Sequence, residues 1–313
     1  TVRVSYTDAL STAESTTSSA TPAKSVFNLS TLASGNGSTG FVINGVDAHD
    51  NSGFSVNSAG DMNGDGYADI IIGAAKADPN ANSSGESYVV FGKASGYSAS
   101  LDLSSLNGTT GFVLNGEGYN DFSGWQVNTA GDINNDGYDD VLVGAWNDGV
   151  GSSYVVFGKA SGYSASLNLS TLNGTTGFSI TGINSDDKAG YSLSTAGDVN
   201  GDGYDDIIIG ADKGDPNGTD SGEAYVVFGK ASGYSSNLNL SSLNGSNGYV
   251  LNGINGLDYA GHSVSTAGDI NGDGYADIII GAIKGDPNGG DSGESYVVFG
   301  KASGYSSSLN LSS

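Results

Sequence analysis

The stretch "DINGDGYADIIIGA", from Asp269 to Ala282, joins a turn rich in side-chain oxygen atoms directly to an apolar run. Asp269, Asn271, Asp273 and Asp277 occupy positions 1, 3, 5 and 9 of this stretch. The run "DIIIGA" that closes it is short, continuous and rich in β-branched residues, which is typical of a strand buried on both faces. The pattern therefore predicts a polar loop that opens directly into a core β-strand.

The same kind of stretch occurs four times in the 313 residues of the chain, beginning at Asp61, Asp132, Asp198 and Asp269. Successive copies start 71, 66 and 71 residues apart, and each is followed by "YVVFGKASGYS" and preceded by a segment like "NGTTGFVLNG". The second unit is shorter in the loop "AWNDGVGSSY", which indicates a surface loop rather than a strand. Self-similarity at a fixed period predicts equivalent units that are stacked or arranged around an axis.

Each unit contains four segments with strand patterns. Examples are "GFVLNG" at residues 111–116, "YSLSTAG" at 191–197, "DIIIGA" at 206–211 and "AYVVFGK" at 224–230. Asn-Gly, Asp-Gly and Ser-Gly turns separate the segments. No segment shows sustained helical periodicity. We therefore predict an all-β fold, a β-propeller built from four-stranded antiparallel blades. Stacked β-sandwiches are the alternative, but each sandwich would need about seven strands and ~100 residues.

The repeats place a domain boundary near residue 25. Residues 1–25 are a Ser/Thr-rich segment, which we interpret either as a flexible leader or as a strand-forming interaction arm. Residues 26–313 are predicted to form the propeller, with units at about 26–93, 94–159, 160–230 and 231–301.

The order of segments leaves the size of the ring open. If "GFVLNG" is the outer strand of the preceding blade, the first copy, residues 40–45, follows no blade and the last blade lacks its outer strand. The first copy then either closes a ring of four blades or completes a blade of another chain. The second arrangement would give a larger ring or an open polymer.

The oxygen-rich turn has the donor pattern of a calcium loop. Glycine at position 6 allows a sharp turn, so that alternate side chains converge and the carbonyl of position 7 joins them; Ca²⁺ accepts six to eight such oxygen ligands. The four loops contain no His or Cys, which argues against zinc and copper as the bound metal. Mg²⁺ prefers fewer protein ligands than these loops offer. An EF-hand needs a glutamate at position 12, where this chain has Ile72, Val143, Ile209 and Ile280, so the position-9 aspartate is expected to be the last ligand.

The four loops together predict about four bound calcium ions. Twelve loop aspartates account for half of the net charge of −24, and four Ca²⁺ ions would cancel eight units of it. The predicted ligands are Asp61, Asn63, Asp65, Tyr67 (carbonyl) and Asp69; Asp132, Asn134, Asp136, Tyr138 (carbonyl) and Asp140; Asp198, Asn200, Asp202, Tyr204 (carbonyl) and Asp206; and Asp269, Asn271, Asp273, Tyr275 (carbonyl) and Asp277.

These units resemble the FG-GAP repeat of integrin α-subunit propellers and their bacterial relatives. The "FG" positions correspond to Gly53-Phe54, Gly124-Trp125, Gly190-Tyr191 and Gly261-His262, and the "GAP" positions to Gly73-Ala74, Gly144-Ala145, Gly210-Ala211 and Gly281-Ala282, without the proline. The resemblance covers about residues 26–305 and implies a propeller with Ca²⁺ in hairpin loops on one face. Integrin propellers have seven blades and this chain has four units.

The composition argues against nucleic acid and anionic membranes as partners. The chain has 34 Asp and Glu against 10 Lys and Arg, so it would repel nucleic acid and anionic membranes, and no apolar run approaches the ~20 residues of a membrane helix. We expect an extracellular or cell-surface protein, and, if it is exported, a mature form or an excised piece.

The sequence suggests no catalytic centre. Repeated or paired nucleophilic His/Ser/Asp patterns are absent, so an enzyme is not expected. His262 and the recurrent Tyr97, Tyr163, Tyr234 and Tyr305 are interpreted as packing residues, although the tyrosines offer the alternative of a sugar-stacking ring.

The leading functional prediction is a secreted, calcium-binding, non-catalytic propeller that serves as a structural or adhesive module. The alternatives are a subunit that assembles into an extracellular filament or surface layer through its N-terminal arm or blade edges, and a carbohydrate-binding or hydrolytic propeller. The partner classes are calcium ions, other copies of the chain, and surface proteins or glycans.

Overall fold

The computed structural model describes residues 3–7, 13–17 and 29–312, and the chain divides into two compact units. Unit 1 comprises Thr1–Val42 with Tyr97–Ser100, and unit 2 comprises Ile43–Gly96 with Leu101–Ser313. No helix among the described residues is long and apolar enough to cross a membrane.

Unit 1 contains a small hairpin and a short helical turn. Strands β1 (Arg3–Thr7) and β2 (Ala13–Thr17) pair antiparallel with each other, and α1 spans Ser30–Ala33. Residues 1–25 are predicted to be a flexible leader or a strand-forming arm, and β1 and β2 of this segment pair with each other. Residues 1–2, 8–12 and 18–25 lie outside the described residues.

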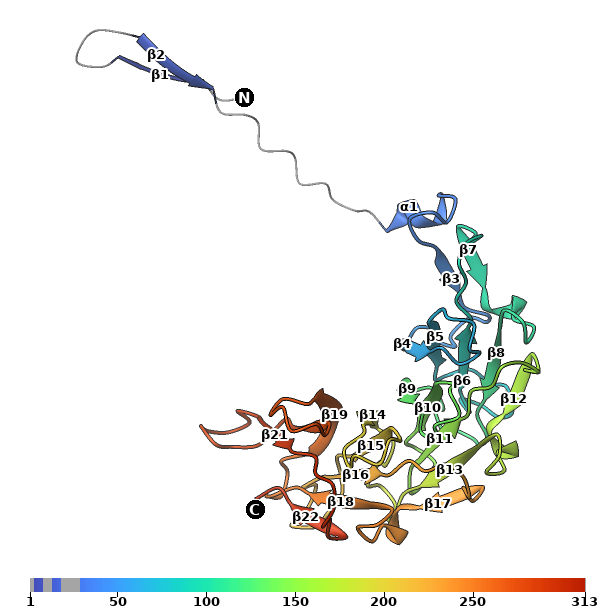
Figure 1. Cartoon of the computed structure of the whole chain (residues 1–313), viewed down its shortest axis with the longest axis vertical. Coiled ribbons are helices and arrows are strands. Elements are labelled where there is room, and N and C mark those ends of the chain that lie inside the picture. The colour runs from blue at the N-terminus through green and yellow to red at the C-terminus, as the bar shows by residue number, and fades with distance from the viewer. Residues whose placement is uncertain (1–2, 8–12, 18–28, 313) are drawn as a thin grey trace. The chain divides into compact units, whose positions relative to one another are not determined.

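Unit 2 is a row of antiparallel sheets, each formed mainly from one repeat (Figure 1). The first sheet contains β4 (Ser55–Gly60), β5 (Asp69–Ala74), β6 (Glu86–Val90) and β8 (Gly111–Asn115). The second contains β9 (Val127–Gly131), β10 (Asp140–Ala145), β11 (Ser152–Val156) and β13 (Gly177–Thr181). The third contains β14 (Ser192–Gly197), β15 (Asp206–Ala211), β16 (Glu223–Val227) and β18 (Gly248–Asn252). The fourth contains β19 (Ala260–Gly268), β20 (Asp277–Ala282) and β21 (Glu294–Val298).

The first three sheets each carry a fifth, short strand that the sequence analysis did not anticipate. Strands β12 (Ser166–Asn168), β17 (Asn237–Asn239) and β22 (Ser308–Asn310) pair parallel with β8, β13 and β18 respectively. The equivalent β7 (Ser100–Asp102) pairs with β3 (Val42–Asn44) in a separate two-stranded sheet. One-turn 3₁₀-helices follow three of these short strands, at Leu103–Ser105, Leu169–Thr171 and Leu240–Ser242.

The all-β prediction is confirmed, and repeated antiparallel sheets agree with a β-propeller. The "GFVLNG" segment is the outer strand of the preceding sheet, as proposed, because β8 pairs with β6 and β18 with β16. Four complete blades and a closed ring are not seen among the described strands, since the fourth sheet has three strands and β3 pairs with β7. The ring size stays a prediction.

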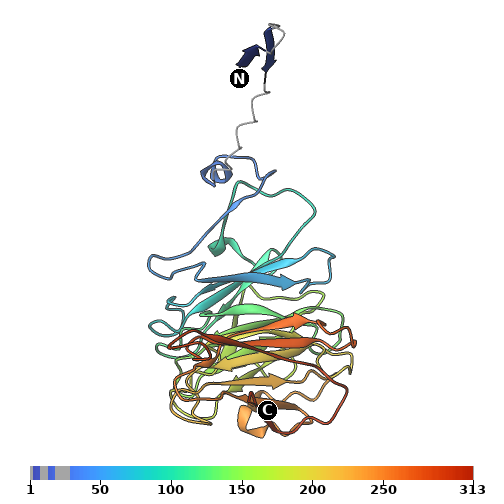
Figure 2. The ribbon, with the colours of Figure 1, turned by 90° about the vertical axis from the view of Figure 1, so that its left-hand side faces the viewer.

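The core of unit 2 lies between neighbouring sheets. Inner strand β4 contacts β9, β9 contacts β14, and β14 contacts β19, and Figure 2 shows the sheets lying in layers. Between the second and third sheets, Leu142, Val155 and Phe178 pack against Ile209 and Tyr225, and all of them are buried. Burial on both faces explains why the central strands are continuous apolar runs rather than alternating ones.

Candidate metal centres

Each oxygen-rich loop connects the inner strand of a sheet to the next strand, and it is closed by its own side chains. In the third loop, Asp198 Oδ1 accepts from the Asp202 amide at 3.1 Å, and Asp198 Oδ2 accepts from the Gly203 amide at 2.9 Å. Asn200 Oδ1 accepts from the same Asp202 amide at 2.9 Å, and Asp202 Oδ1 accepts from Tyr204 at 3.1 Å. In this loop the side chains at positions 1, 3 and 5 therefore all accept from backbone amides of the same turn.

The turn depends on glycine at position 6. Gly203 has φ +88°, in the left-handed region that side-chain-bearing residues rarely adopt. Equivalent glycines stand in the other three loops, with φ between +86° and +93°. The same bonds from position 1 to the amides of positions 5 and 6 recur in all four loops.

The position-9 aspartate lies on the core side of the loop. Asp206 is the first residue of β15 and is fully buried. Its Oδ2 accepts from the Val199 amide at 3.0 Å, and its Oδ1 accepts from the Gly229 amide at 2.9 Å. Asp69, Asp140 and Asp277 are equally buried and make the equivalent pairs of bonds. This aspartate therefore ties the loop to the strand that follows it and to the end of the next strand.

The loop carboxylates lack a protein counter-charge. Burial, reinforced by the nearby carboxylates at positions 1 and 5, raises the pKa of Asp140 to about 9, of Asp206 to about 8 and of Asp69 to about 6. In the described part of the chain, no lysine, arginine or histidine forms an ion pair with a loop aspartate. His262 pairs with Asp212, which lies outside the loops. An added cation would relieve the repulsion within each loop.

The donor set suits a hard cation, but the acidic groups are not drawn into one cluster. Within the described ranges, no three His, Cys, Asp or Glu side chains are grouped closely enough to form a ready metal centre. Positions 1, 3 and 5 converge, whereas both oxygens of position 9 accept backbone amides. Carboxylate, amide and carbonyl oxygens are nevertheless the ligand types that Ca²⁺ takes. The ligand assignment stays a prediction.

Two aspartates that the sequence analysis missed connect neighbouring loops. Asp139 Oδ2 accepts from the Asp61 amide at 2.6 Å, and Asp205 Oδ2 accepts from the Asp132 amide at 2.9 Å. They occupy position 8, where the first and fourth loops have alanine. The sequence shows this difference as "GYDD" in the second and third loops and "GYAD" in the first and fourth, and it could have pointed to these two aspartates. The loops therefore lie next to one another on the same side of the row of sheets.

The recurrent tyrosines also connect the sheets. Tyr163 stacks on Phe112 with a centroid distance of 4.8 Å, and its hydroxyl donates to the Met62 carbonyl at 2.7 Å. Tyr234 and Tyr305 make the equivalent stacks and hydrogen bonds to the next two loops. The packing interpretation is thus confirmed for these three tyrosines.

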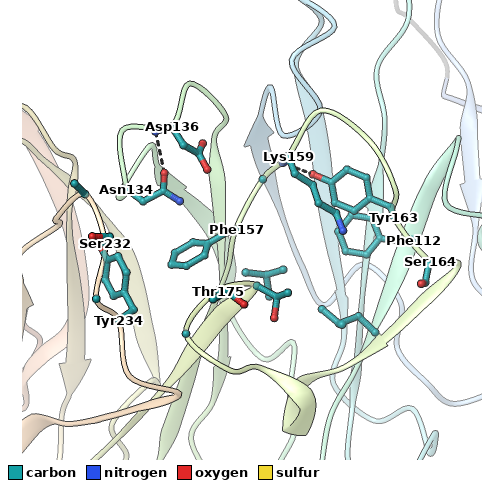
Figure 3. A pocket seen from close by; sticks show the side chains of 17 residues that line it. Phe112, Asn134, Asp136, Phe157, Lys159, Tyr163, Ser164, Thr175, Ser232 and Tyr234 are labelled. Carbon is teal, nitrogen blue, oxygen red and sulfur yellow. Dashed lines mark hydrogen bonds between the residues drawn. The ribbon is translucent and has the colours of Figure 1, made fainter.

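A cavity lies between Tyr163 and Tyr234, beside the second loop (Figure 3). Asn134 and Asp136 of that loop line it together with Phe157. One face of each of these two tyrosine rings lies against a phenylalanine, and both tyrosines line the cavity. The sugar-stacking alternative stays a prediction.

His262 packs as expected at the far end of an aromatic row. Phe54, Trp125, Tyr191 and His262 follow one another with centroid distances of 4.5, 5.8 and 5.2 Å. His262 Nδ1 lies 2.8 Å from Asp212 Oδ2. The row follows the "FG" positions of the four repeats and links the inner strands of the four sheets.

Comparison with known families identifies the repeat. The FG-GAP repeat model matches residues 53–90, 189–227 and 260–298, in the first, third and fourth sheets. The chain is 28% identical to integrin alpha-6 of Homo sapiens over 188 residues, which is 58% of this chain and 14% of that protein. It is 28% identical to integrin alpha pat-2 of Caenorhabditis elegans over 250 residues, 75% of this chain and 18% of that protein. It is 36% identical to integrin alpha-PS2 of Drosophila melanogaster over 132 residues, 41% of this chain and 9% of that protein.

The chain therefore carries three FG-GAP repeats and is homologous to integrin α subunits. It spans less than a fifth of the length of these relatives. The second unit lacks a family match, yet its sheet has the strand order of the first and third sheets. The shortened loop and Asn135 in place of the position-4 glycine distinguish this unit in sequence.

Proposed function

We propose that this chain is a calcium-binding, non-catalytic module with a structural or adhesive role outside the cell. The observation that carries the proposal is the set of four loops, each with oxygen donors at positions 1, 3 and 5 bonded around one turn, and with aspartates that form no ion pair with a basic side chain in the part of the chain that the structure describes. The homology to integrin α subunits supports an adhesive role.

In each loop, the aspartates at positions 1, 5 and 9 and the asparagine at position 3 would hold the ion, with the position-7 tyrosine contributing its carbonyl. The ion would supply positive charge where three carboxylates otherwise repel one another. Its binding free energy would add to the stability of the folded state. The residues of the chain meanwhile fix the loop, through the amide bonds of position 1 and the anchoring of position 9 to the core.

Thermal unfolding with Ca²⁺ and with EGTA tests the proposal. A site filled at one hundred times its Kd stabilises the folded state by about 2.7 kcal/mol, so we expect a clear rise in Tm with Ca²⁺. Mg²⁺ at the same concentration should raise Tm less. An equal Tm in Ca²⁺ and EGTA would contradict calcium binding.

Calorimetric titration of a single-loop variant tests the ligand assignment. Asp202→Ala removes an exposed position-5 carboxylate that accepts one backbone amide, and it should reduce the number of bound ions by one. Asp47→Asn changes an exposed acid outside the loops and serves as the matched control. Unchanged stoichiometry in Asp202→Ala would remove that residue from the ligand set.

The adhesive role requires its own measurement. Beads coated with the chain should attach to cells or to matrix proteins in Ca²⁺ and detach in EGTA. Beads that fail to attach in Ca²⁺, with a chain that still binds the ion, would leave a structural module without adhesion.

A further inference from the structure

A cavity of about 460 Å³ lies between two consecutive copies of the loop "KASGYS", at residues 159–164 and 230–235 (Figure 3). Its volume falls within the roughly 300–1,000 Å³ that is typical of small-molecule sites. All of the lining residues fall between positions 112 and 234, away from both ends of the row of sheets. The cavity is therefore formed entirely by repeats that have a sheet on either side.

The floor of this cavity is apolar and buried. Phe112 is 1% exposed, Val156 is 2% exposed and Phe157 is 8% exposed. The ring of Phe157 packs against Phe178 and Tyr234, with centroid distances of 5.9 and 5.2 Å. Aromatic rings that are fixed by such packing offer a rigid apolar surface to the C–H groups of a ligand.

The rim of the cavity is polar and open to solvent. Ser164, Thr175 and Ser232 line the cavity and are exposed, and each carries a hydroxyl group that can donate or accept a hydrogen bond. Asn134 and Asp136 of the second oxygen-rich loop add an amide and a carboxylate. A ligand would therefore meet apolar groups on one face and hydrogen-bonding groups around its edge.

Lys159 adds an ammonium group beside Tyr163. Its Nζ donates to the Gly162 carbonyl at 3.1 Å and lies 4.8 Å from the centroid of the Tyr163 ring. An ammonium group has three N–H donors, and the bond to Gly162 uses one of them. The chain thus positions this side chain while it keeps donor capacity for a ligand.

The equivalent cavity between the third and fourth units is smaller, at about 250 Å³. Asn247 stands there in place of Thr176. The Asn247 side chain donates to the Ser242 carbonyl at 3.2 Å and accepts from the Asn244 amide at 3.0 Å. Because this volume lies below the range of small-molecule sites, we expect only the larger cavity to take a ligand.

We propose that the larger cavity binds one neutral pyranose unit of a glycan. A pyranose ring carries C–H groups on its faces and hydroxyl groups around its edge, which matches the apolar floor and the polar rim. The net charge of −24 and the Asp136 carboxylate disfavour sugars that carry a carboxylate or a sulfate. The proposal does not rest on calcium, since the floor and most of the rim lie outside the loop that would hold the ion.

Saturation-transfer NMR tests the site with four probes, the methyl pyranosides of glucose, galactose, mannose and N-acetylglucosamine. At least one of them should bind with a Kd of about 1 mM, the affinity expected for about thirteen non-hydrogen atoms at ordinary ligand efficiency. The methyl pyranoside of glucuronic acid, which adds a carboxylate, should bind more weakly. Absence of saturation in all four neutral probes well above that concentration, in Ca²⁺ and in EGTA, would overturn the proposal.

A blocked cavity locates the bound sugar. Ser232→Trp places an indole in the opening and should weaken binding by about tenfold or more. Ser95→Trp makes the same change at the equivalent exposed position of the first "KASGYS" copy, which lines neither cavity, and should bind like the unmodified chain. Thermal unfolding of both variants checks that they fold. An equal loss of binding in both would place the sugar elsewhere and overturn the proposal.

A lysine pair tests the rim. Lys159→Met keeps the length of the side chain but removes its donors, and it should weaken binding by about three- to tenfold. Lys301→Met is the matched control, because Lys301 Nζ makes the same contacts with Gly304 and Tyr305 but lines neither cavity. If Lys159→Met and Ser232→Trp both bind like the unmodified chain, the proposal is wrong.

Indole serves as an apolar competitor that carries no hydroxyl group. It should displace the bound pyranoside only weakly, because it leaves the rim without hydrogen-bond partners. If indole binds, Ser232→Trp blocks it and none of the pyranosides binds, the cavity takes an apolar ligand and the proposal is overturned.

Discussion

The third and fourth sheets have nearly the same sequence but different surroundings. Both contain "DIIIGA" followed by "YVVFGK". Val226 and Phe228 of the third sheet are 0% and 8% exposed, whereas Val297 and Phe299 of the fourth are 43% and 54% exposed. An apolar run therefore becomes core only where a neighbouring sheet covers it, and identical residues contribute differently to stability at the end of the row.

Truncation of the paired phenylalanines should show the largest difference. Phe228→Ala removes a ring packed against Tyr249 and Tyr305 and should cost about 3–5 kcal/mol of unfolding free energy. Phe299→Ala removes a half-exposed ring and should cost under about 1 kcal/mol at a protein concentration where the chain is monomeric. Chemical denaturation measures both variants. Equal losses would mean that the fourth sheet is covered in the monomer.

The link between loops gives the next largest effect. Asp205→Ala leaves the Asp132 amide without its carboxylate partner and should cost about 1–3 kcal/mol. The reverse change, Ala276→Asp, places a carboxylate beside the Asp198 loop, to which Ala276 already donates its backbone amide through the Asp198 carbonyl.

Ala276→Asp should raise the unfolding free energy by about 0.5–1.5 kcal/mol in Ca²⁺. In EGTA the gain should shrink, because the added carboxylate then faces uncompensated negative charge. Denaturation curves under both conditions measure this. A gain that is the same with and without Ca²⁺ would contradict charge compensation in the third loop.

The sequence was informative where a repeat fixes local structure. Continuous apolar runs predicted the central strands, and the segment order predicted that residues 111–115 pair with the preceding sheet. The sharp turn at position 6 of each loop followed from its glycine, because the turn is a local property of the backbone.

Features that depend on the register between sheets could not be predicted. The short strands β12, β17 and β22 have only three residues each, too few for a periodic pattern. Asp139 and Asp205 gain their role only from the neighbouring loop that each contacts. Ring closure depends on angles between sheets that accumulate along the row, and no single motif encodes them.

Removal of the Tyr234 hydroxyl, which donates to the second loop, should lower the free energy of unfolding by less than Phe228→Ala or Asp205→Ala. Tyr234→Phe keeps the ring stacked on Phe178 but deletes the hydrogen bond to the Ile133 carbonyl, at a cost of about 0.5–1.5 kcal/mol. Tyr119→Phe, at a position 69% exposed, is the matched control and should be close to neutral. Thermal unfolding of both variants measures the difference. A neutral Tyr234→Phe would show that the stacked ring alone holds the loop.

A half-buried glutamate of the third sheet, Glu223, gives the smallest and most specific prediction. Burial raises the pKa of Glu223, whose carboxylate accepts from the Tyr225 hydroxyl. Because the folded-state pKa lies above the unfolded value, the contribution of Glu223 to stability is fully present at pH below about 4.5 and is lost as pH rises through the folded-state pKa.

Glu223→Gln keeps an acceptor for Tyr225 and removes the titration. Its free energy of unfolding should therefore fall less than that of the unmodified chain as the pH is raised from 4.5 to 7.5, and chemical denaturation at the two pH values measures the difference. If the free energy of unfolding changes with pH by the same amount in Glu223→Gln and in the unmodified chain, burial does not perturb this glutamate in the folded state.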